Sequence, residues 1–369
     1  MKKRLIFFSI LFFATIVYSQ EYSPQFKMLE QVKTTSVKNQ GKTGTCWAFA
    51  STSFVETELL RMGFDEIDLS EMFTVRHKLL PMAEKYIRYH GKTNFGDGGL
   101  AHDLLNVVSE FGFVPEDVYT GKNIGLKEHN QKEMMNVLQG MLDGTLKEDI
   151  LTPKWKDAIE AVLNTYLGAL PQKFNYKGKE YTPKSFRDFT GFNPQNYVEI
   201  TSYLDAPFYT KYNLELPDNW SNNEFYNIPV NELIEVIEYA INNGYSVCWD
   251  GDSGKDNFYR EEGYAVIPVD EVDEKENNFP QIEKNITQNM RQDAFETFDV
   301  TDDHLMQLVG IAEDQNGTKF YYTKNSWGTE DKTYDGYWYM SEAYVRLKTI
   351  AIMVHKDSIP QNIKEKLGI

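Results

Sequence analysis

The segment around the first of two cysteines carries the residues best suited to covalent chemistry. Residues 37–50 read VKNQGKTGTCWAFA, so Gln40 lies six residues before Cys46. A cysteine thiolate can attack a carbonyl carbon, and this attack places a negative charge on the carbonyl oxygen. The Gln40 amide and the backbone N–H of Cys46 are suitable hydrogen-bond donors to that oxygen. The segment therefore predicts a nucleophile with its own oxyanion hole.

The residues on either side of Cys46 indicate how the chain positions it. Gly41 and Gly44 allow a tight turn, and an apolar pattern then predicts a helix from Cys46 to Met62, ended by Gly63. At the N-terminus of that helix, unpaired N–H groups and the helix dipole would lower the pKa of the thiol. A single cysteine is nevertheless more often a small buried apolar residue, so a catalytic role requires partners elsewhere in the chain.

Two such partners lie near the end of the chain. His304 precedes a predicted strand in the segment DDHLMQLVG, and Asn325 opens the segment NSWG shortly after the predicted strand 319–323. If these strands are antiparallel neighbours, the Asn325 oxygen can accept a hydrogen bond from His304 and turn its other ring nitrogen toward Cys46. Trp327 would shield that bond from water. Taken separately, His304 would be a polar core or surface residue and NSWG a turn, but the cysteine motif in the same chain favours a catalytic site.

The combined pattern resembles the papain-like cysteine peptidases. The string QGxxGxCWAF, the later histidine and the NSWG segment match that family in order, with Gln40, Cys46, His304 and Asn325 at the four site positions. The resemblance extends from about Gln31 to the end of the chain. It implies an α+β fold in which a helical N-terminal subdomain and a β-rich C-terminal subdomain hold the active site between them. It also implies peptide substrates and an acyl-enzyme intermediate, without a cofactor.

Within that family the chain looks most similar to the bleomycin hydrolase and aminopeptidase C branch. The shared features are a long insertion over about 120–227, a DGG loop that ends in Gly98 and Gly99, an HLM segment before NSWG, and no obvious propeptide. The resemblance implies that the paired glycines bring backbone close to the substrate. In the branch, a C-terminal arm enters the cleft of a hexamer and its carboxylate receives the substrate's amino group. Ile369 would take that role here, which implies an aminopeptidase and a homo-oligomer, a hexamer by resemblance.

The chain also departs from this branch. The tail after His355 has only 14 residues, shorter than such enzymes usually carry, and branch members are typically cytosolic, whereas this chain opens with an export pattern. An endopeptidase with an open cleft is therefore an alternative within the same class. A peptide-binding protein without activity, built on the same scaffold, is an alternative from a different class.

The first nineteen residues have the three-part pattern of a secretory signal. Three basic residues at positions 2–4 precede an apolar run from Leu5 to Val17, and small side chains stand before a cleavage site near Ser19. The run of 13 residues is too short to span a bilayer comfortably, and no later segment approaches 18 uninterrupted apolar residues. The sequence thus predicts a secreted or periplasmic protein without a membrane span.

The mature chain, residues 20–369, is long enough for a sizeable core and is predicted to form one peptidase domain. Its expected parts are a mainly helical region with the insertion over about 30–228, a mainly β region over about 229–355, and a tail over 356–369. His102, in one of the predicted helices, is expected at the surface. Shorter patterns predict helices near residues 100–111, 155–166 and 229–241, and a hairpin over 174–181.

Composition excludes several other classes. The formal net charge of −17 argues against nucleic acid as a partner, because phosphates repel an acidic protein.

Cys248 falls in a strand-like apolar segment and is predicted to be buried and unpaired, since a disulfide with Cys46 would consume the nucleophile. Acidic residues within 250–261 partly follow a calcium-loop spacing, but Gly254 and Lys255 interrupt it, so no metal site is predicted.

A strongly acidic run extends from Asp270 to Asp303, with eleven acidic residues against three basic ones. Such a run could favour cationic peptides as substrates. It is more typical of a solvated face that aids solubility, and that is the interpretation adopted for this sequence.

Overall fold

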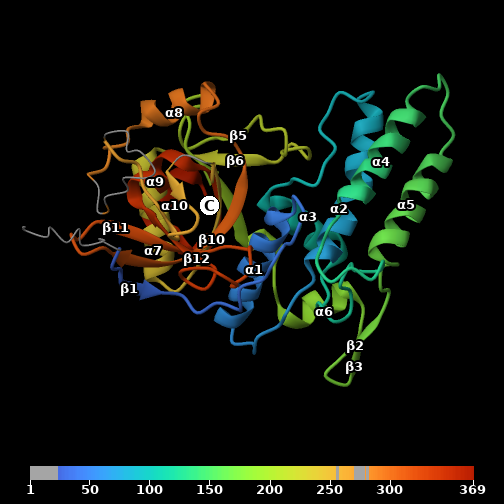
Figure 1. Cartoon of the computed structure of the whole chain (residues 1–369), viewed down its shortest axis with the longest axis horizontal. Coiled ribbons are helices and arrows are strands. Elements are labelled where there is room, and N and C mark those ends of the chain that lie inside the picture. The colour runs from blue at the N-terminus through green and yellow to red at the C-terminus, as the bar shows by residue number, and fades with distance from the viewer. Residues whose placement is uncertain (1–23, 255–256, 270–278, 280–281) are drawn as a thin grey trace, which may run out of the picture.

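The computed structural model describes residues 24–254, 257–269, 279 and 282–369. The predicted export signal lies outside these residues and stays a prediction. In the described chain, helices gather in one lobe and strands in another, and α1 (Cys46–Arg61) lies between the two (Figure 1). None of the described helices is long and apolar enough to cross a membrane.

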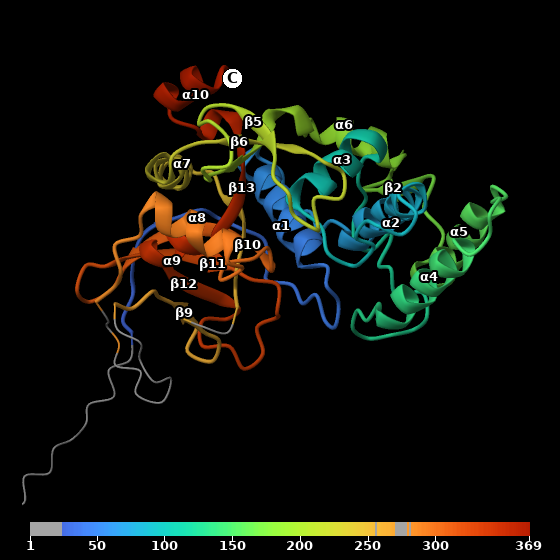
Figure 2. The ribbon, with the colours of Figure 1, turned by 90° about the horizontal axis from the view of Figure 1, so that it is seen from above.

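The N-terminal half of the chain forms the helical lobe. Its helices after α1 are α2 (Glu71–Arg88), α3 (Ala101–Phe111), α4 (Lys132–Thr145), α5 (Lys154–Leu167) and α6 (Pro183–Thr190). The predicted helices near residues 46–62, 100–111 and 155–166 are confirmed, and the predicted hairpin consists of β2 (Phe174–Tyr176) and β3 (Lys179–Tyr181). Figure 2 shows α4 and α5 side by side at the edge of this lobe, away from the sheet.

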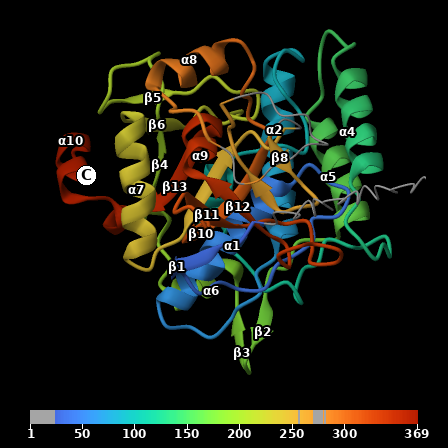
Figure 3. The same cartoon turned by 60° about the vertical axis from the view of Figure 1, so that its left-hand side comes forward.

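Eleven strands of the described chain form one sheet, in the order β5-β6-β4-β13-β7-β10-β11-β12-β9-β8, with β1 paired to β10. The strands are β1 (Lys27–Gln31), β4 (Tyr197–Thr201), β5 (Lys211–Asn213), β6 (Glu224–Asn227), β7 (Val247–Gly251), β8 (Phe258–Tyr259), β9 (Tyr264–Ala265), β10 (His304–Glu313), β11 (Lys319–Lys324), β12 (Tyr337–Ser341) and β13 (Thr349–His355). The helices of this lobe are α7 (Val230–Asn242), α8 (Gln288–Glu296), α9 (Glu342–Lys348) and α10 (Gln361–Leu367) (Figure 3).

Alternate side chains of β7 and β10 pack into two different hydrophobic cores. Trp249 and Met306 are paired across these strands and pack in the cluster that includes α7. Cys248 and Leu305 point to the other face, where they join the cluster that includes α1. Cys248 is buried and makes no disulfide, as predicted. Leu305, the residue after His304, therefore packs in the core that contains α1.

Helix α1 is buried along almost its whole length, from Cys46 to Leu59. Its polar face is bonded to the sheet. Oε1 of Gln307 on β10 accepts a hydrogen bond from Ser53 Oγ (2.7 Å), and Nε2 of Gln307 donates to Thr57 Oγ1 (2.9 Å). Buried polar groups are tolerated when they are paired in this way, and the pairs hold α1 in one register on β10. The nucleophile's helix is thus fixed to the strand that carries His304.

The sheet also takes in strands from before residue 228, within the part predicted to be mainly helical. β4 and β6 precede that residue, yet β4 pairs with β13 and β6 pairs with β4 inside the large sheet. These strands have five and four residues, and β4 finds its partner about 150 residues later in the chain. Such pairing leaves no local periodicity that would assign the segment to the β lobe.

Candidate active site

A cavity of about 350 Å³ lies between the lobes at the N-terminus of α1. Six of the eight predicted site residues line it, from both lobes. Asn325 stands directly behind it, bonded to His304, and Ile369 lies elsewhere. The described residues that line the cavity are Gln40, Gly44, Cys46, Gly98, Gly99, Asp218, Ser253, Arg260, Asp302, Asp303, His304, Leu305 and Trp327.

Cys46 is the first residue of α1, as predicted, but its pKa is not lowered there. Burial, with a smaller contribution from the nearby Asp302 charge, raises the pKa of the Cys46 thiol to about 12. Backbone hydrogen bonds from Leu305 and Trp47 act in the opposite direction and have the smaller effect. The predicted lowering of the thiol pKa at the helix N-terminus is therefore not found, because removal of the sulfur from water outweighs the dipole.

His304 and Asn325 meet as predicted from neighbouring antiparallel strands, since β10 pairs with β11. His304 Nε2 lies 2.8 Å from Asn325 Oδ1, so the Nε2–H donates to the amide oxygen and Nδ1 is the basic nitrogen. Trp327 stacks on the imidazole with ring centroids 4.8 Å apart and 28° between the planes. Burial lowers the pKa of His304, which favours the neutral imidazole. The ring is therefore oriented, shielded and able to accept a proton.

The charge states of Cys46 and His304 depend on each other. Burial disfavours an isolated thiolate at Cys46, and it also disfavours an isolated imidazolium at His304. A proton transferred from the thiol to the imidazole would create both charges together, and each would then stabilise the other. The imidazole, more than the helix end, is thus the group on which formation of the thiolate depends.

Gln40 is fixed at the cavity by hydrogen bonds of its backbone and side chain. Its backbone N–H donates to Ser326 O (2.8 Å), and its Oε1 accepts from Ser326 Oγ (2.7 Å). Nε2 then donates one hydrogen bond to Thr43 O (2.9 Å), and a primary amide has a second N–H to give. Because Gln40 and Cys46 line the same cavity, this N–H and the backbone N–H of Cys46 can serve one oxygen.

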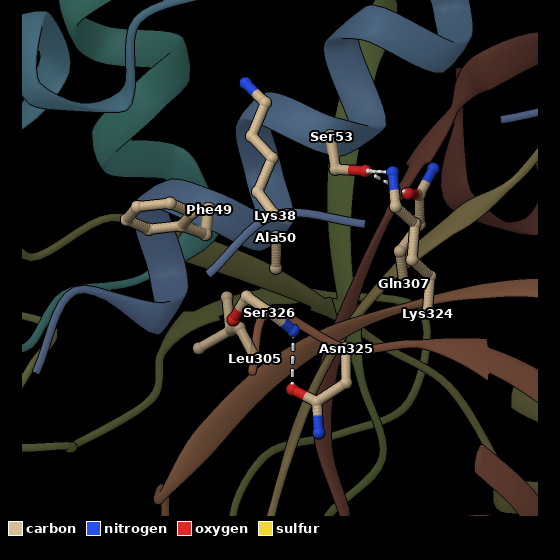
Figure 4. A pocket seen from close by; sticks show the side chains of 9 residues that line it. All are labelled: Lys38, Phe49, Ala50, Ser53, Leu305, Gln307, Lys324, Asn325 and Ser326. Carbon is tan, nitrogen blue, oxygen red and sulfur yellow. Dashed lines mark hydrogen bonds between the residues drawn. The ribbon is translucent and has the colours of Figure 1, made fainter. Parts of the chain in front are cut away.

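A polar cluster behind the cavity joins the lobes (Figure 4). Lys324 Nζ donates to Ser53 Oγ (2.7 Å) and Thr35 Oγ1 (3.1 Å), and burial lowers the pKa of Lys324 to about 8. Ser53 belongs to the same helix as Cys46, whereas Lys324 immediately precedes Asn325. The cluster therefore ties the nucleophile's helix to the residue that orients the imidazole.

Ile369 is not brought to the cavity. Helix α10 packs through Ile363 and Leu367 into the core that contains α7, on the other face of the sheet. Lys366 on the same helix pairs with Glu232 at 2.7 Å. Figure 3 shows the C-terminus beside α7, at the outer side of the β lobe. This packing contradicts the predicted role of Ile369 in substrate binding, because burial of the apolar face of α10 directs the chain end away from Cys46.

Sequence reasoning missed the charged residues of the cavity. Asp218, Asp302 and Asp303 line it, and Arg260 lies over the Trp327 ring at 4.9 Å from its centroid. A single charged residue in a loop has neither a motif nor a period, so nothing local marks it. The one available signal was the position of the two aspartates directly before the predicted catalytic histidine.

The predicted surface position of His102 is wrong. This side chain is 2 % exposed, and its Nδ1 lies 2.6 Å from Glu199 Oε2 on β4. Burial lowers the pKa of His102, but the Glu199 carboxylate more than offsets this effect and the pKa is raised. His102 thus joins α3 to the sheet on the cavity side, a contact that only the pairing of β4 with β13 makes understandable.

Comparisons with known proteins agree with this architecture. The model of the Peptidase C1-like family matches residues 14–368. Aminopeptidase C from Lactobacillus delbrueckii subsp. lactis is 22% identical over 94% of this chain and 84% of its own length. Aminopeptidase W from the same organism is 23% identical over 91% of this chain and 84% of its own length.

A solved structure shows the same fold. PepW from Lactobacillus rhamnosis HN001 superposes with a TM-score of 0.74, at 18% identity, over 93% of this chain and 84% of that protein. The α+β fold expected from the papain-like resemblance is therefore confirmed. The family model matches nearly the whole chain, and the curated relatives belong to the aminopeptidase C branch. The sequence and the fold therefore indicate the same family. The chain belongs to the peptidase C1-like family and is a papain-like cysteine peptidase.

Proposed function

We propose that this chain is an aminopeptidase that hydrolyses peptide bonds through an acyl-enzyme on Cys46. The observation that carries the proposal is the convergence of Cys46 from the helical lobe and His304 from the β lobe on one cavity, with Asn325 bonded to the imidazole. The preference for chain ends is supported by the similar proteins, which are named aminopeptidases C and W.

In the proposed acylation step, Nδ1 of His304 accepts the proton of the Cys46 thiol as the sulfur bonds to the scissile carbonyl carbon. The carbonyl π electrons move to oxygen, where the Gln40 amide and the Cys46 backbone N–H donate to the oxyanion. When the carbonyl re-forms, the C–N bond breaks and His304 returns its proton to the leaving amine. The products of this step are a thioester on Cys46 and a free amine.

The thioester is then hydrolysed by the same groups. His304 Nδ1 accepts a proton from a water molecule as the water oxygen attacks the thioester carbon, and the oxyanion hole is used again. Collapse of the second tetrahedral intermediate breaks the C–S bond, and the sulfur recovers the proton from His304. Throughout both steps the Asn325 bond keeps the ring in one tautomer, so Asn325 acts as a positioning residue.

A cleavage assay tests this proposal. Each of several short peptides is offered with a free and with an N-acetylated amino terminus, and the products are identified by mass spectrometry. An aminopeptidase releases single residues from the free peptides and leaves the acetylated ones intact. Internal cleavage of both forms at similar rates would contradict the proposal.

An open-cleft endopeptidase is the second candidate, and one observation favours it. The terminal Ile369 packs beside α7, so the chain end does not close the cavity in this structure. Unless another group limits the cleft, long peptides could then pass through it. The same assay separates the two candidates, because only an endopeptidase yields internal fragments.

We also propose that the enzyme is exported and that it forms a homo-oligomer. Export is supported by the basic, apolar and small-residue order of positions 1–19. Oligomerisation is supported by the resemblance to the bleomycin hydrolase branch alone. Cell fractionation with N-terminal sequencing tests the first proposal, and sedimentation velocity tests the second. Cytoplasmic protein that retains Met1 would contradict export, and a single monomeric species would contradict assembly.

A further inference from the structure

The cavity is lined by aspartates that have no role in the proposed hydrolysis. Asp218, Asp302 and Asp303 line it against one positive side chain among the described residues, that of Arg260. Of these aspartates, only Asp303 is bonded to a neighbour that lines the cavity, accepting from Ser253 Oγ (2.9 Å). Asp218 and Asp302 take part in none of the ion pairs of the described chain, although both are partly buried. Lys78 is a buried cation near Asp218, but its ammonium group is already bonded to the backbone oxygen of Gly98. Two carboxylates that form no ion pair in a partly desolvated groove invite a cationic ligand.

The position of Arg260 indicates which side of Cys46 receives the leaving group of the substrate. Arg260 stacks on Trp327, which in turn stacks on His304. Since His304 must protonate the leaving amine, the leaving group lies on this side of Cys46. The acyl part of the substrate, which includes its amino terminus, extends to the opposite side. Asp218 adjoins Gly98 in the helical lobe, whereas Arg260 belongs to the β lobe, which agrees with an acyl part on the Asp218 side.

Asp218 is positioned at the wall that would flank the acyl part. Its Oδ1 accepts a hydrogen bond from Asn94 Nδ2 (2.6 Å), which fixes the carboxylate. Its Oδ2 lies so close to Gly98 that a Cβ on that glycine would come within 1.9 Å of it. The carboxylate therefore occupies space that exists only because residue 98 has no side chain. Neighbouring Gly99 likewise leaves no room for one, since a Cβ there would lie 2.7 Å from Asp103.

A second acidic residue lies behind Asp302. Asp250, which is 4 % exposed, lies behind it on β7, and its carboxyl oxygens find no hydrogen-bond donor in the described chain other than the carboxyl group of Asp302. Burial and the charge of Asp218 raise the pKa of Asp302 to about 7. The hydrogen bond with Asp250 and the nearby His102 act in the opposite direction, and Glu199 already binds His102. An additional cation would relieve this crowding of carboxyl groups.

We propose that Asp302 and Asp218 form the subsite that receives the substrate's α-ammonium group, a role for which the sequence suggested the carboxylate of Ile369. The inference rests on the proposed aminopeptidase function and names its specificity-determining residues. An ammonium group donates three hydrogen bonds, and charge-assisted bonds of this kind are about twice as strong as neutral ones. Held at Asp302 and Asp218, the amino terminus would leave only a residue or two between itself and Cys46. Release of short N-terminal units would follow from the position of this charge.

The test compares three amides of nearly equal size on full-length enzyme. Alanine p-nitroanilide carries the α-ammonium group, N-acetylalanine p-nitroanilide blocks it, and propionic acid p-nitroanilide lacks it. Asp302→Asn and Asp218→Asn remove one charge each with little change in shape. Asp299→Asn, at an exposed position in the same acidic segment, is the matched control for net charge. A fourth variant carries a Gly-Ser-Gly-Ser extension after Ile369, which displaces the terminal carboxylate.

We expect Asp302→Asn to lower the ratio of kcat/KM for the alanine amide to that for the propionic amide by about 10- to 10³-fold, and Asp218→Asn to lower the same ratio by about 10-fold. Asp299→Asn and the extended chain should behave like the unmodified enzyme. Circular dichroism and alkylation of Cys46 by iodoacetamide establish that each variant is folded. For a variant that fails this check, Asp302→Ser or Asp218→Ser takes its place.

Two results would overturn the inference in different ways. If the unmodified enzyme prefers the alanine amide but both aspartate variants keep that preference while the extension removes it, the chain end is the receptor and only this inference fails. If the unmodified enzyme cleaves the alanine and propionic amides equally well, the aminopeptidase function fails and this inference fails with it. A preference that is lost in the aspartate variants alone supports both.

Discussion

The two walls of the cavity are built in different ways. One wall, here called the catalytic wall, consists of Gln40, Cys46 and His304, and each of these side chains is held by backbone or side-chain bonds or by the end of a helix or strand. The other, the acidic wall, consists of Asp218 and Asp302, which come from loops and take part in none of the ion pairs of the described chain. The chemistry is thus placed on rigid elements, while the groups that would select the substrate stand on connecting segments.

This difference explains why one wall has a sequence signature and the other has none. A nucleophile needs its base and its oxyanion donors within a fraction of an ångström, so residue type and spacing are tightly constrained around Cys46. A carboxylate that receives an ammonium group acts over a longer range and can be supplied from several places. Substitutions in each wall test whether catalysis and substrate selection depend on separate residues.

The largest expected effect comes from removal of the nucleophile. Cys46→Ala should lower kcat by at least about 10⁴-fold, since no other described side chain of the cavity can form the thioester. The fold should persist because the volume removed is small. Turnover of a free peptide and the melting temperature are measured on the same preparation. Residual turnover near the unmodified rate would show that Cys46 is not the nucleophile.

The next effect concerns formation of the thiolate. Burial raises the pKa of Cys46 to about 12, so without the imidazole the thiolate should appear only at high pH. His304→Ala is therefore expected to slow alkylation of Cys46 by iodoacetamide at pH 7 by about 100-fold, with the rate recovering as the pH rises. His102→Ala is the control, since it removes a buried imidazole that does not line the cavity. Unchanged alkylation in His304→Ala would mean that the helix end alone activates the sulfur.

A smaller loss is expected from the positioning residue. Asn325→Ala removes the 2.8 Å bond to His304 but leaves the nucleophile and the base in place. We expect kcat/KM to fall by about 10- to 10³-fold, mostly through kcat. Asn325→Asp keeps an acceptor oxygen at the same place, and a partial recovery of kcat in that variant would identify the bond as the cause. An unaltered rate in Asn325→Ala would mean that stacking on Trp327 is sufficient to hold the ring.

Much of the fold and of the catalytic wall could be predicted from the sequence, for identifiable physical reasons. The helix at Cys46 and the strands that carry His304 and Asn325 follow from local apolar periodicity, and those strands are close in sequence. The sites that sequence reasoning missed depend on long-range pairing. His102 is buried only because β4 joins β13, and Asp218 reaches the cavity only because its loop folds over Gly98.

The pKa of Cys46 shows a second limit of sequence reasoning. The N-terminal position in α1 was visible in the sequence, but the depth at which both lobes cover the sulfur was not, and depth has the larger effect. The position of Ile369 was missed for a related reason. The apolar residues of α10 were visible, but the surface on α7 that receives them exists only in the folded β lobe.

The smallest expected effect tests the acidic wall through stability and not through activity. Burial raises the pKa of Asp302 from 3.8 to about 7, aided by the charges of Asp218 and Asp303 and opposed by the hydrogen bond with Asp250 and by His102. The folded protein therefore retains a proton that the unfolded chain releases. By linkage, the stability associated with this group is complete below about pH 4 and is lost as the pH rises through 7.

An asparagine at this position carries no charge at any of these pH values, so Asp302→Asn should stabilise the protein most where the aspartate would be ionised. We expect the melting temperature to rise by a few degrees at pH 8 and by less at pH 5, whereas Asp299→Asn should show no such difference between the two values. Equal shifts at both pH values would mean that the pKa of Asp302 is not raised in the folded protein, and the acidic wall would then have no cost to stability of this kind. A pH-dependent gain in stability, combined with a selective loss of activity toward free amino termini, would show that the acidic wall is kept at a cost to stability for the sake of substrate selection.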